Sequence, residues 1–357
     1  MSTASEVVRR VTRRAFLEGA GVVATAAGAS TFLGSRLLLA EGGSLVASPP
    51  AGFVPMTAPG KVVRVHRSDV LMPNKIYPKA DAARQMLERA MLEFTGESDI
   101  AKAFGRFVHK DDKVAIKLNG IAAQSGQFMG TNKELVIPIV EGVIASGVPA
   151  TSVVVYEQYA GFLNGTRVRE KDLPSGVKTM VHTNSDATMA EIRVAGVRTK
   201  FVRPLTEATA VINVALIKDH SICGYTGCLK NMTHGSIINP SDFHAHNASP
   251  QIAELYAHDI LKSRVRLHIT DGFKVIYDGG PLDKRPECRV PHESVYIATD
   301  PVAMDTIGWG VVESLRKDKN LPTLAKARRE PTYIRVASER GLGIAKLDDI
   351  KLREITL

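Results

Sequence analysis

Short apolar runs rich in Val and Ile alternate with amphipathic stretches through most of the chain. Six runs have the length and β-branched content of buried strands: 61–67, 113–120, 152–158, 210–217, 265–270 and 294–299. Helices are predicted between them, over 80–95, 98–108 and 131–147, from Ser249–Pro250 onward, and from Asp300–Pro301 to about residue 315. This alternation predicts an α/β fold, a layered sandwich with a largely parallel central sheet flanked by helices.

The clearest unit is a strand, a helix and a strand between residues 113 and 158. Thr131 and Glu134 form a capping-box pattern at the start of the helix, and Gly147 follows its end. Two buried strands joined by a helix indicate a parallel crossover connection. The less regular segment 179–202 is expected to form a hairpin.

The N-terminal segment differs from the rest of the chain. Thr12, Arg13, Arg14, Phe16 and Leu17 follow the twin-arginine pattern ahead of a Gly- and Ala-rich apolar run. A charged residue at position 36 leaves this run too short and too polar for a membrane span. We therefore expect a twin-arginine signal over 1–47, with a basic tail or a retained signal anchor as the alternatives.

This interpretation predicts the twin-arginine translocase as a partner during export, a periplasmic location and no stable membrane span. Residues 48–60, rich in Pro, Gly and Ala, are expected to be a linker, and 61–357 a single α/β domain.

Charge and cysteine content narrow the function classes. Residues 1–47 hold five Arg and three Glu, so without them the net charge falls from +9 to +7. The remaining basic excess suits a small anionic ligand. After residue 47 there is no run of Lys and Arg with interleaved aromatic residues, so nucleic-acid binding is not expected. The three cysteines form no ferredoxin-type run, which makes an iron–sulfur cluster a weaker expectation than a divalent metal ion.

Ionisable and amide side chains follow several predicted strands. Open α/β sheets bind ligands beyond the carboxyl ends of their strands, so these residues are candidates for a site. Those expected to bind a small anionic substrate are Lys117, Asn119, Lys218 and Asn231, because Lys supplies a point charge and Asn a donor and an acceptor. Lys230 and Asp305 are the candidate catalytic residues, although Asp305 lies in a predicted helix and also suits a solvent-facing position.

Histidines gather in one polar stretch, residues 218–246, which holds four of the ten in the chain. Imidazole and carboxylate groups ligate divalent metals, and the candidate ligands are His220, His244, His246 and Asp271. The alternatives are a solvated loop with unrelated histidines and, for Asp271, a turn before Gly272.

An ordered set of short motifs resembles the domain of unknown function 362 family. The set comprises KDH at 218–220, TGCLKN at 226–231, a His near 244–246, TDG at 270–272, GGP at 279–281, TDPVAMD at 299–305 and ERGLG at 339–343. The resemblance covers about residues 61–345 and implies a site at Lys218, His220, Lys230, Asn231, Asp271, Asp300 and Asp305. The family often has Thr where this chain has Asp219, and some members carry a ferredoxin module that this chain lacks.

These features suggest an exported enzyme that uses a divalent metal, binds a small anionic substrate at the strand carboxyl ends, or does both. Two alternatives stay open. One is a redox protein with Cys223 and Cys228 as ligands, although packing or a disulfide suits them better. The other is a non-catalytic periplasmic anion-binding protein.

Overall fold

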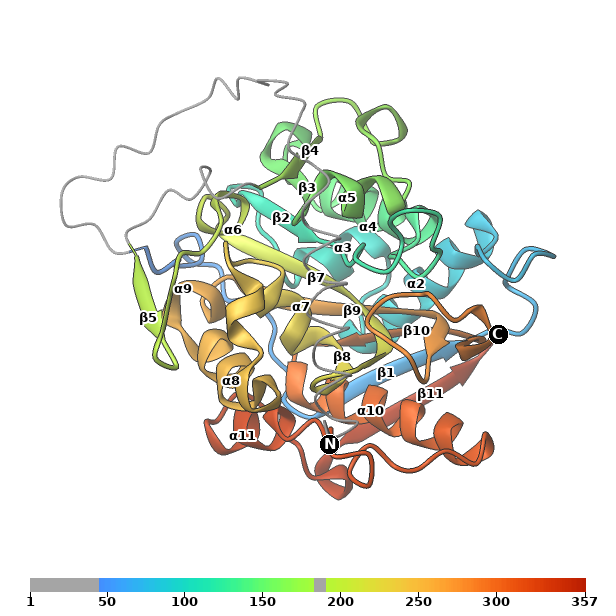
Figure 1. Ribbon diagram of the computed structural model, residues 1–357. Coiled ribbons are helices and arrows are strands. Elements are labelled where there is room, and N and C mark those ends of the chain that lie inside the picture. Colours follow the sequence, from blue (N-terminus) through green and yellow to red (C-terminus); the bar gives the residue numbers. More distant parts are fainter. Residues whose placement is uncertain (1–44, 183–190) are drawn as a thin grey trace.

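The computed structural model describes residues 45–182 and 191–357, and a mixed nine-stranded sheet runs through its centre (Figure 1). The sheet order is β11-β1-β10-β9-β7-β2-β3-β4, and β8 pairs with β7 outside this path. The strands are β1 (Lys61–His66), β2 (Val114–Lys117), β3 (Val153–Glu157), β4 (Lys178–Val181), β7 (Ala210–His220), β8 (Gly224–Thr226), β9 (Val265–Ile276), β10 (Arg289–Ala298) and β11 (Lys351–Thr356).

Strands β9, β7, β2, β3 and β4 are mutually parallel neighbours, and β11 is parallel to β1. Strand β10 is antiparallel to both β9 and β1. Asp300, which follows β10, therefore lies toward the opposite edge of the sheet from Lys218. Its carboxylate caps the next helix by accepting hydrogen bonds from Val302 N and Ala303 N, as the Asp-Pro pattern predicts.

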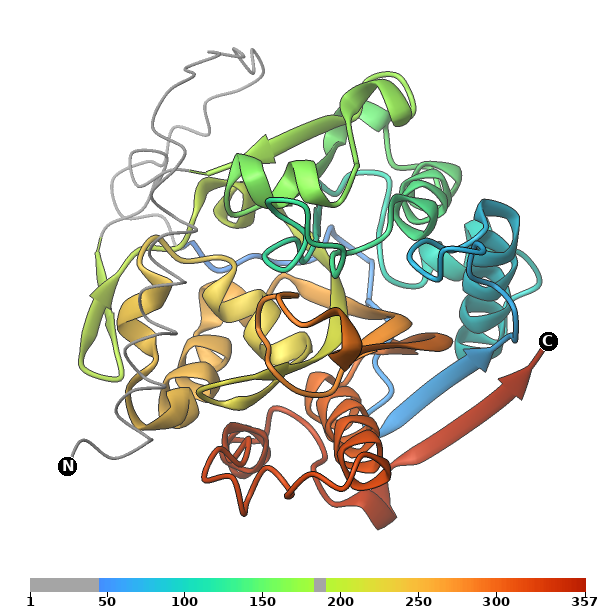
Figure 2. The same cartoon turned by 45° about the vertical axis from the view of Figure 1, so that its right-hand side comes forward.

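Helices cover both faces of the sheet, as Figures 1 and 2 show from two directions. They create two separate apolar cores. One core is formed by α2 (Ala80–Thr95), α3 (Ile100–Gly105) and α4 (Lys133–Ala145). The other is formed largely by α7 (Cys228–His234), α8 (Ser249–Ala257), α10 (Pro301–Asp318) and α11 (Tyr333–Glu339). The remaining helices are α5 (Ala160–Gly165), α6 (Arg203–Thr206) and α9 (Asp259–Lys262). The predicted layered α/β fold is confirmed.

Neighbouring strand residues alternate between the two cores. Val63 and Val65 of β1 belong to the first, whereas Val62 belongs to the second. In β7 every residue is buried, because helices cover both faces of a parallel strand. The polar end of this strand, Lys218 to His220, is thereby carried into the interior.

Several local predictions need correction. The helix after β2 begins at Lys133 without a capping box, because Thr131 Oγ1 accepts a hydrogen bond from Asn119 N at 2.8 Å. Helix α7 and strand β11 lie in segments where the sequence indicated no element. The expected hairpin in 179–202 is present as β5 (Ile192–Val194) and β6 (Val197–Thr199), with residues 183–190 outside the described part.

Of the N-terminal predictions, the structure describes the segment expected to be a linker and only the end of the expected signal. Most of the expected signal, residues 1–44, lies outside the described residues. The expected linker docks onto the body: Met56 N donates to Arg106 O and Ala58 N to Thr299 Oγ1, both at 2.8 Å. The single domain expected over 61–357 stays a prediction.

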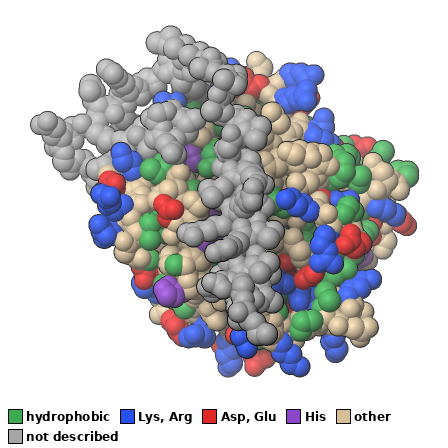
Figure 3. All heavy atoms as spheres, viewed as in Figure 1, with side chains coloured by type: hydrophobic (Ala, Val, Ile, Leu, Met, Phe, Trp, Pro, Cys, Tyr) green, Lys and Arg blue, Asp and Glu red, His purple; other side chains and the backbone are tan. Residues whose placement is uncertain are grey.

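The surface carries both signs of charge on the face seen in Figure 3, where Lys and Arg are interspersed with Asp and Glu. Within residues 45–182 and 191–357, no helix is both long and apolar enough to cross a membrane.

Candidate functional site

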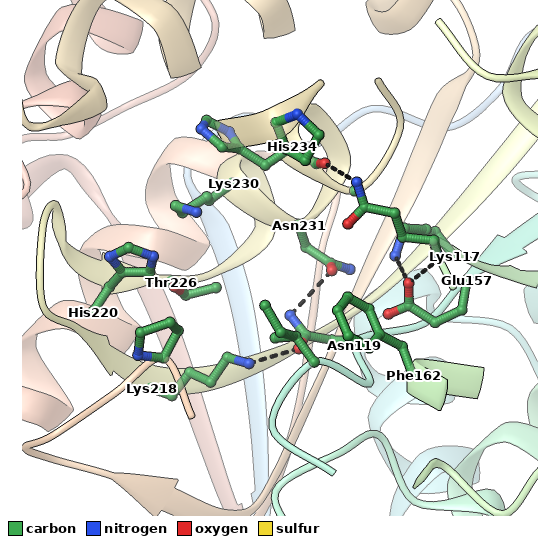
Figure 4. A pocket seen from close by; sticks show the side chains of 15 residues that line it. Lys117, Asn119, Glu157, Phe162, Lys218, His220, Thr226, Lys230, Asn231 and His234 are labelled. Carbon is green, nitrogen blue, oxygen red and sulfur yellow. Dashed lines mark hydrogen bonds and ion pairs between the residues drawn. The ribbon is translucent and has the colours of Figure 1, made fainter. Parts of the chain in front are cut away.

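A small cavity of about 50 Å³ lies where β2, β3 and β7 end at the same edge of the sheet, facing α7 (Figure 4). The polar residues that line it are Lys117, Asn119, Glu157, Gln158, Lys218, His220, Thr226, Lys230, Asn231 and His234. The apolar ones include Ile121, Phe162, Pro240 and Pro281. All four residues predicted to bind substrate, Lys117, Asn119, Lys218 and Asn231, come together here with Lys230.

On the β2–β3 side, Lys117 and Glu157 form a buried ion pair. Lys117 Nζ lies 3.0 Å from Glu157 Oε2 and donates to Leu118 O at 2.6 Å. Glu157 also accepts from Gly120 N at 2.7 Å and from Gln158 N. Burial lowers the pKa of Lys117, and the neighbouring Glu157 carboxylate opposes that shift. The charge of Lys117 is therefore balanced by Glu157, and neither group needs a ligand to compensate it.

A directional chain of hydrogen bonds crosses the floor of the cavity. Lys218 Nζ donates to Asn119 Oδ1 at 2.7 Å, and Asn119 Nδ2 donates to Asn231 Oδ1 at 3.0 Å. Asn231 Nδ2 then donates to Asn213 Oδ1 at 2.7 Å, and Asn213 Nδ2 contacts His268 Nδ1 at 2.9 Å. Each amide uses its donor on one side and its acceptor on the other. The chain therefore fixes all three amide orientations and presents an acceptor to Lys218.

On the β7–α7 side, two lysines are buried without a carboxylate partner among the described residues. Lys218 is fully buried and contacts Asn119, while Lys230 Nζ lies 3.2 Å from His244 Nε2. Burial, reinforced by the positive charge of Lys230, lowers the pKa of Lys218 to about 7. Burial also lowers the pKa of Lys230. When these amines are protonated, the cavity wall carries positive charge that no carboxylate of the described residues pairs.

His220 faces the same cavity as a neutral hydrogen-bond donor. Its Nδ1 accepts from Ile222 N at 3.1 Å, so the ring proton of the neutral form must sit on Nε2. Burial, with Lys230 and two neighbouring histidines, depresses the pKa of His220 well below its ordinary value. A metal ligand needs a free lone pair, and in this tautomer neither nitrogen offers one.

His234 and His244 also contact neighbouring groups. His234 Nε2 lies 3.1 Å from Phe243 O and must donate to that carbonyl, which ties α7 to the following loop. The His244 ring stacks on that of His220 with centroids 5.5 Å apart. In the described part of the chain, no three His, Cys, Asp or Glu side chains are grouped so that they could hold a metal ion. The predicted set of His220, His244, His246 and Asp271 is therefore not assembled.

Comparison with known families now adds to this geometry. Residues 114–310 match the family described as Domain of unknown function (DUF362). The chain belongs to the DUF362 family. The matched range begins at β2 and ends inside α10, so it contains every residue that lines the cavity. No curated protein matches the chain.

Three other residues that the motifs singled out lie away from the cavity of this DUF362 protein. Asp271 is buried in the middle of β9 and accepts from Asn132 N at 2.7 Å, which anchors the start of α4. Asp305 accepts from Cys228 N and from Leu229 N, the latter at 3.0 Å, and so caps α7 from α10. His246 is exposed. Asp305 thus positions α7, which carries Lys230 and Asn231, whereas Asp271 anchors α4, which carries none of the lining residues.

The close fit between α10 and α7 explains a glycine of the TGCLKN motif. A Cβ on Gly227 would lie 2.2 Å from Asp305 Oδ1 and 2.5 Å from the Tyr225 ring. Only glycine lets the chain pass this point and begin α7 in register with the Asp305 carboxylate.

The additional carboxylate at Asp219 does not reach the cavity. It pairs with Arg329 and accepts from Gly280 N at 3.0 Å on the opposite side of β7 from Lys218. Cys223, Cys228 and Cys288 are free and buried. Burial raises the pKa of Cys223 to about 11 and that of Cys228 well above its ordinary value.

One lining residue carries a signal that sequence reasoning missed. Thr226 is 5% exposed, and its hydroxyl has no hydrogen-bond partner among the described residues. Buried hydroxyls are usually paired, so this one invites a ligand. The sequence could have indicated Thr226 only if the turn between β7 and β8 had been recognised. That turn places Thr226 on the same face of the hairpin as Lys218 and His220.

Proposed function

We propose that this DUF362 protein binds a small anion in the cavity, between Lys218 and Lys230. The observation that carries the proposal is the pair of buried lysines without a carboxylate partner in the described chain. A buried cation is costly unless an opposite charge compensates it or it loses its proton. A bound anion would supply that compensation.

The neighbouring groups support the same ligand chemistry. His220 offers an N–H donor, and the hydroxyl of Thr226 has no partner in the part of the chain that the structure describes. The nearest carboxylate that lines the cavity, Glu157, is already occupied by Lys117 and two backbone N–H groups. The β7–α7 wall therefore favours an acceptor-rich, negatively charged ligand.

Of the two residues predicted as catalytic, Lys230 lines the cavity, where it can exchange a proton with a bound ligand. Asp305 contributes by holding the start of α7. A reaction on the bound anion would thus rely on Lys230 and Lys218 for acid–base chemistry.

Isothermal titration calorimetry with acetate, propionate, phosphate and sulfate tests anion binding. The wild type should bind at least one anion with one-to-one stoichiometry. Lys230→Met should weaken that binding about tenfold or more, because a charge-assisted hydrogen bond is lost. Lys262→Met is the matched control, since Lys262 is exposed on α9. Equal affinities for wild type and Lys230→Met, or no binding at all, would contradict the proposal.

We also propose that residues 1–47 direct twin-arginine export to the periplasm. The support is the Arg13–Arg14 pair ahead of the apolar run in the sequence. A fusion of residues 1–47 to a reporter that is active only outside the cytoplasm should be exported. The double substitution Arg13→Lys and Arg14→Lys should abolish export, and full export of that variant would overturn this assignment.

A further inference from the structure

The β7–β8 hairpin aims three polar side chains into the cavity together. Thr226 of β8 lies directly opposite Lys218 of β7 in the antiparallel register, so their side chains share a face. His220 is two residues beyond Lys218 and projects from that same face. Asp219 projects from the other face toward Arg329. The hairpin therefore builds one wall from a hydroxyl, an imidazole and an amine.

This wall differs chemically from the far end of the cavity. Figure 4 shows Lys218, His220, Thr226 and Lys230 on one side, whereas Phe162 lies on the other, near the closed Lys117–Glu157 pair. Ile121 also lines the cavity. A ligand that fills the space meets hydrogen-bond donors on one side and, on the other, the Phe162 ring beside an ion pair that is already closed.

The size of the cavity limits the ligand. One enclosed water needs roughly 10–15 Å³ of cavity volume, so a cavity of about 50 Å³ accommodates a few water-sized groups. That corresponds to roughly four or five non-hydrogen atoms, the size of acetate or propionate. Because the cavity is open on one side, a larger anion would place only its charged end here and extend out of the mouth.

We propose that the ligand is a short-chain carboxylate whose oxygen accepts a hydrogen bond from the Thr226 hydroxyl, with its carbon chain directed toward Ile121 and Phe162. This inference rests on the proposed anion-binding function and adds the substrate class and a specificity-determining residue. In it, Lys218 and Lys230 supply the charge, and Thr226 selects the position of one carboxylate oxygen.

Thr226→Val tests this inference because Val keeps the shape of Thr and removes only the hydroxyl. The hydroxyl is buried and has no partner within residues 45–182 and 191–357, so the variant should melt at the same temperature as the wild type or higher. Its affinity for propionate, measured by calorimetry, should fall about tenfold. Thr226→Ser keeps the hydroxyl and should retain most of the affinity.

Thr209→Val is the matched control at the opposite end of β7. The Thr209 hydroxyl is paired, donating to Asp112 Oδ1 at 2.6 Å. This variant should melt at a lower temperature and bind propionate like the wild type. A merely structural role for Thr226 would give the same result as Thr209, with lower stability and unchanged affinity.

The outcomes separate the two proposals. If the wild type binds no anion, the proposed function fails. If it binds propionate but Thr226→Val binds equally well, the assignment of Thr226 is overturned while anion binding stands. If the wild type prefers phosphate or sulfate to propionate, the carboxylate class is overturned. Equal losses in Thr226→Ser and Thr226→Val would also contradict a role for the hydroxyl.

Discussion

The two sides of the cavity bury lysines in opposite electrostatic situations. On the β2–β3 side, Lys117 lies 3.0 Å from Glu157, and both are almost fully buried. On the β7–α7 side, Lys218 and Lys230 contact an amide oxygen and an imidazole nitrogen instead of a carboxylate. The same residue type therefore serves two purposes within one cavity.

This difference separates folding from binding. A buried ion pair such as Lys117–Glu157 must stay intact, because removal of one partner strands the other charge. An unpaired buried lysine contributes little to folding but creates a strong demand for an anion. We therefore expect substitutions on the first side to change stability and substitutions on the second to change affinity.

The largest effect should come from Glu157→Gln, which leaves Lys117 buried and uncompensated. The free energy of unfolding, measured by urea denaturation, should fall by about 3–5 kcal/mol. The double variant Lys117→Met with Glu157→Gln should recover much of that loss. If the free energy of unfolding of Glu157→Gln falls by less than about 1 kcal/mol, the proposed difference between the two sides of the cavity is wrong.

Lys218→Met should produce the reverse pattern. Removal of a charge-assisted hydrogen bond should weaken propionate binding by about 1.5–3 kcal/mol, or tenfold to a hundredfold. The free energy of unfolding should fall less than in Glu157→Gln, because relief of the unfavourable burial of the Lys218 amine offsets the loss of its hydrogen bond to Asn119 Oδ1. Calorimetry and urea denaturation on the same preparation measure both quantities. Lower stability with unchanged propionate affinity would show that Lys218, like Lys117, serves folding and not anion binding.

Asp305→Ala should affect both stability and affinity, because Asp305 supports α7 from outside the cavity. Loss of the two backbone hydrogen bonds to Cys228 and Leu229 should lower the free energy of unfolding by about 1–3 kcal/mol. Lys230 sits on the same helix, so propionate affinity should also fall, but less than in Lys218→Met. Wild-type stability in urea denaturation would show that the cap is dispensable.

Anion affinity should decrease as the pH rises through 7. Burial and neighbouring positive charges set the pKa of Lys218 to about 7, so its ammonium form predominates below that pH and the neutral amine above it. Lys230, Lys117, Glu157 and Asp283 are the charged groups that act on it. Propionate stays ionised between pH 6 and 8, and its affinity should fall roughly tenfold over that interval. Lys218→Met should show a flatter profile in the same calorimetric series.

The smallest effect should come from His246→Ala. His246 is exposed and does not line the cavity, although the sequence placed it among candidate metal ligands. Propionate affinity and bound metal content, measured by calorimetry and by inductively coupled plasma mass spectrometry, should match the wild type. A stoichiometric metal lost in this variant would restore the metal hypothesis.

The sequence predicted the fold, and it predicted that several polar residues would meet at one edge of the sheet, for a clear physical reason. Carboxyl ends of parallel strands meet at one edge, so residues such as Lys117 and Lys218 were expected together. The rule failed for Asp271, because β9 continues to Ile276 and buries that carboxylate mid-strand. It also failed for Asp300, because β10 runs antiparallel to its neighbours.

Residue spacing could not reveal the contacts that decide chemistry. The histidines of 218–246 have side chains that can ligate a metal. Hydrogen bonds fix two of their tautomers, however: His220 accepts from Ile222 N, and His234 donates to Phe243 O. Thr226 is inconspicuous in sequence and becomes informative only once the hairpin places it opposite Lys218. These facts depend on tertiary geometry that periodicity does not encode.

Anomalous diffraction from crystals soaked in bromide tests the central claim most directly, because the position of a monoanion is then observed. The account predicts a bromide peak in the cavity within hydrogen-bonding distance of Lys218 Nζ and Lys230 Nζ, displaced when propionate is added. Bromide bound only at exposed lysines, with none beside these two amines, would contradict it.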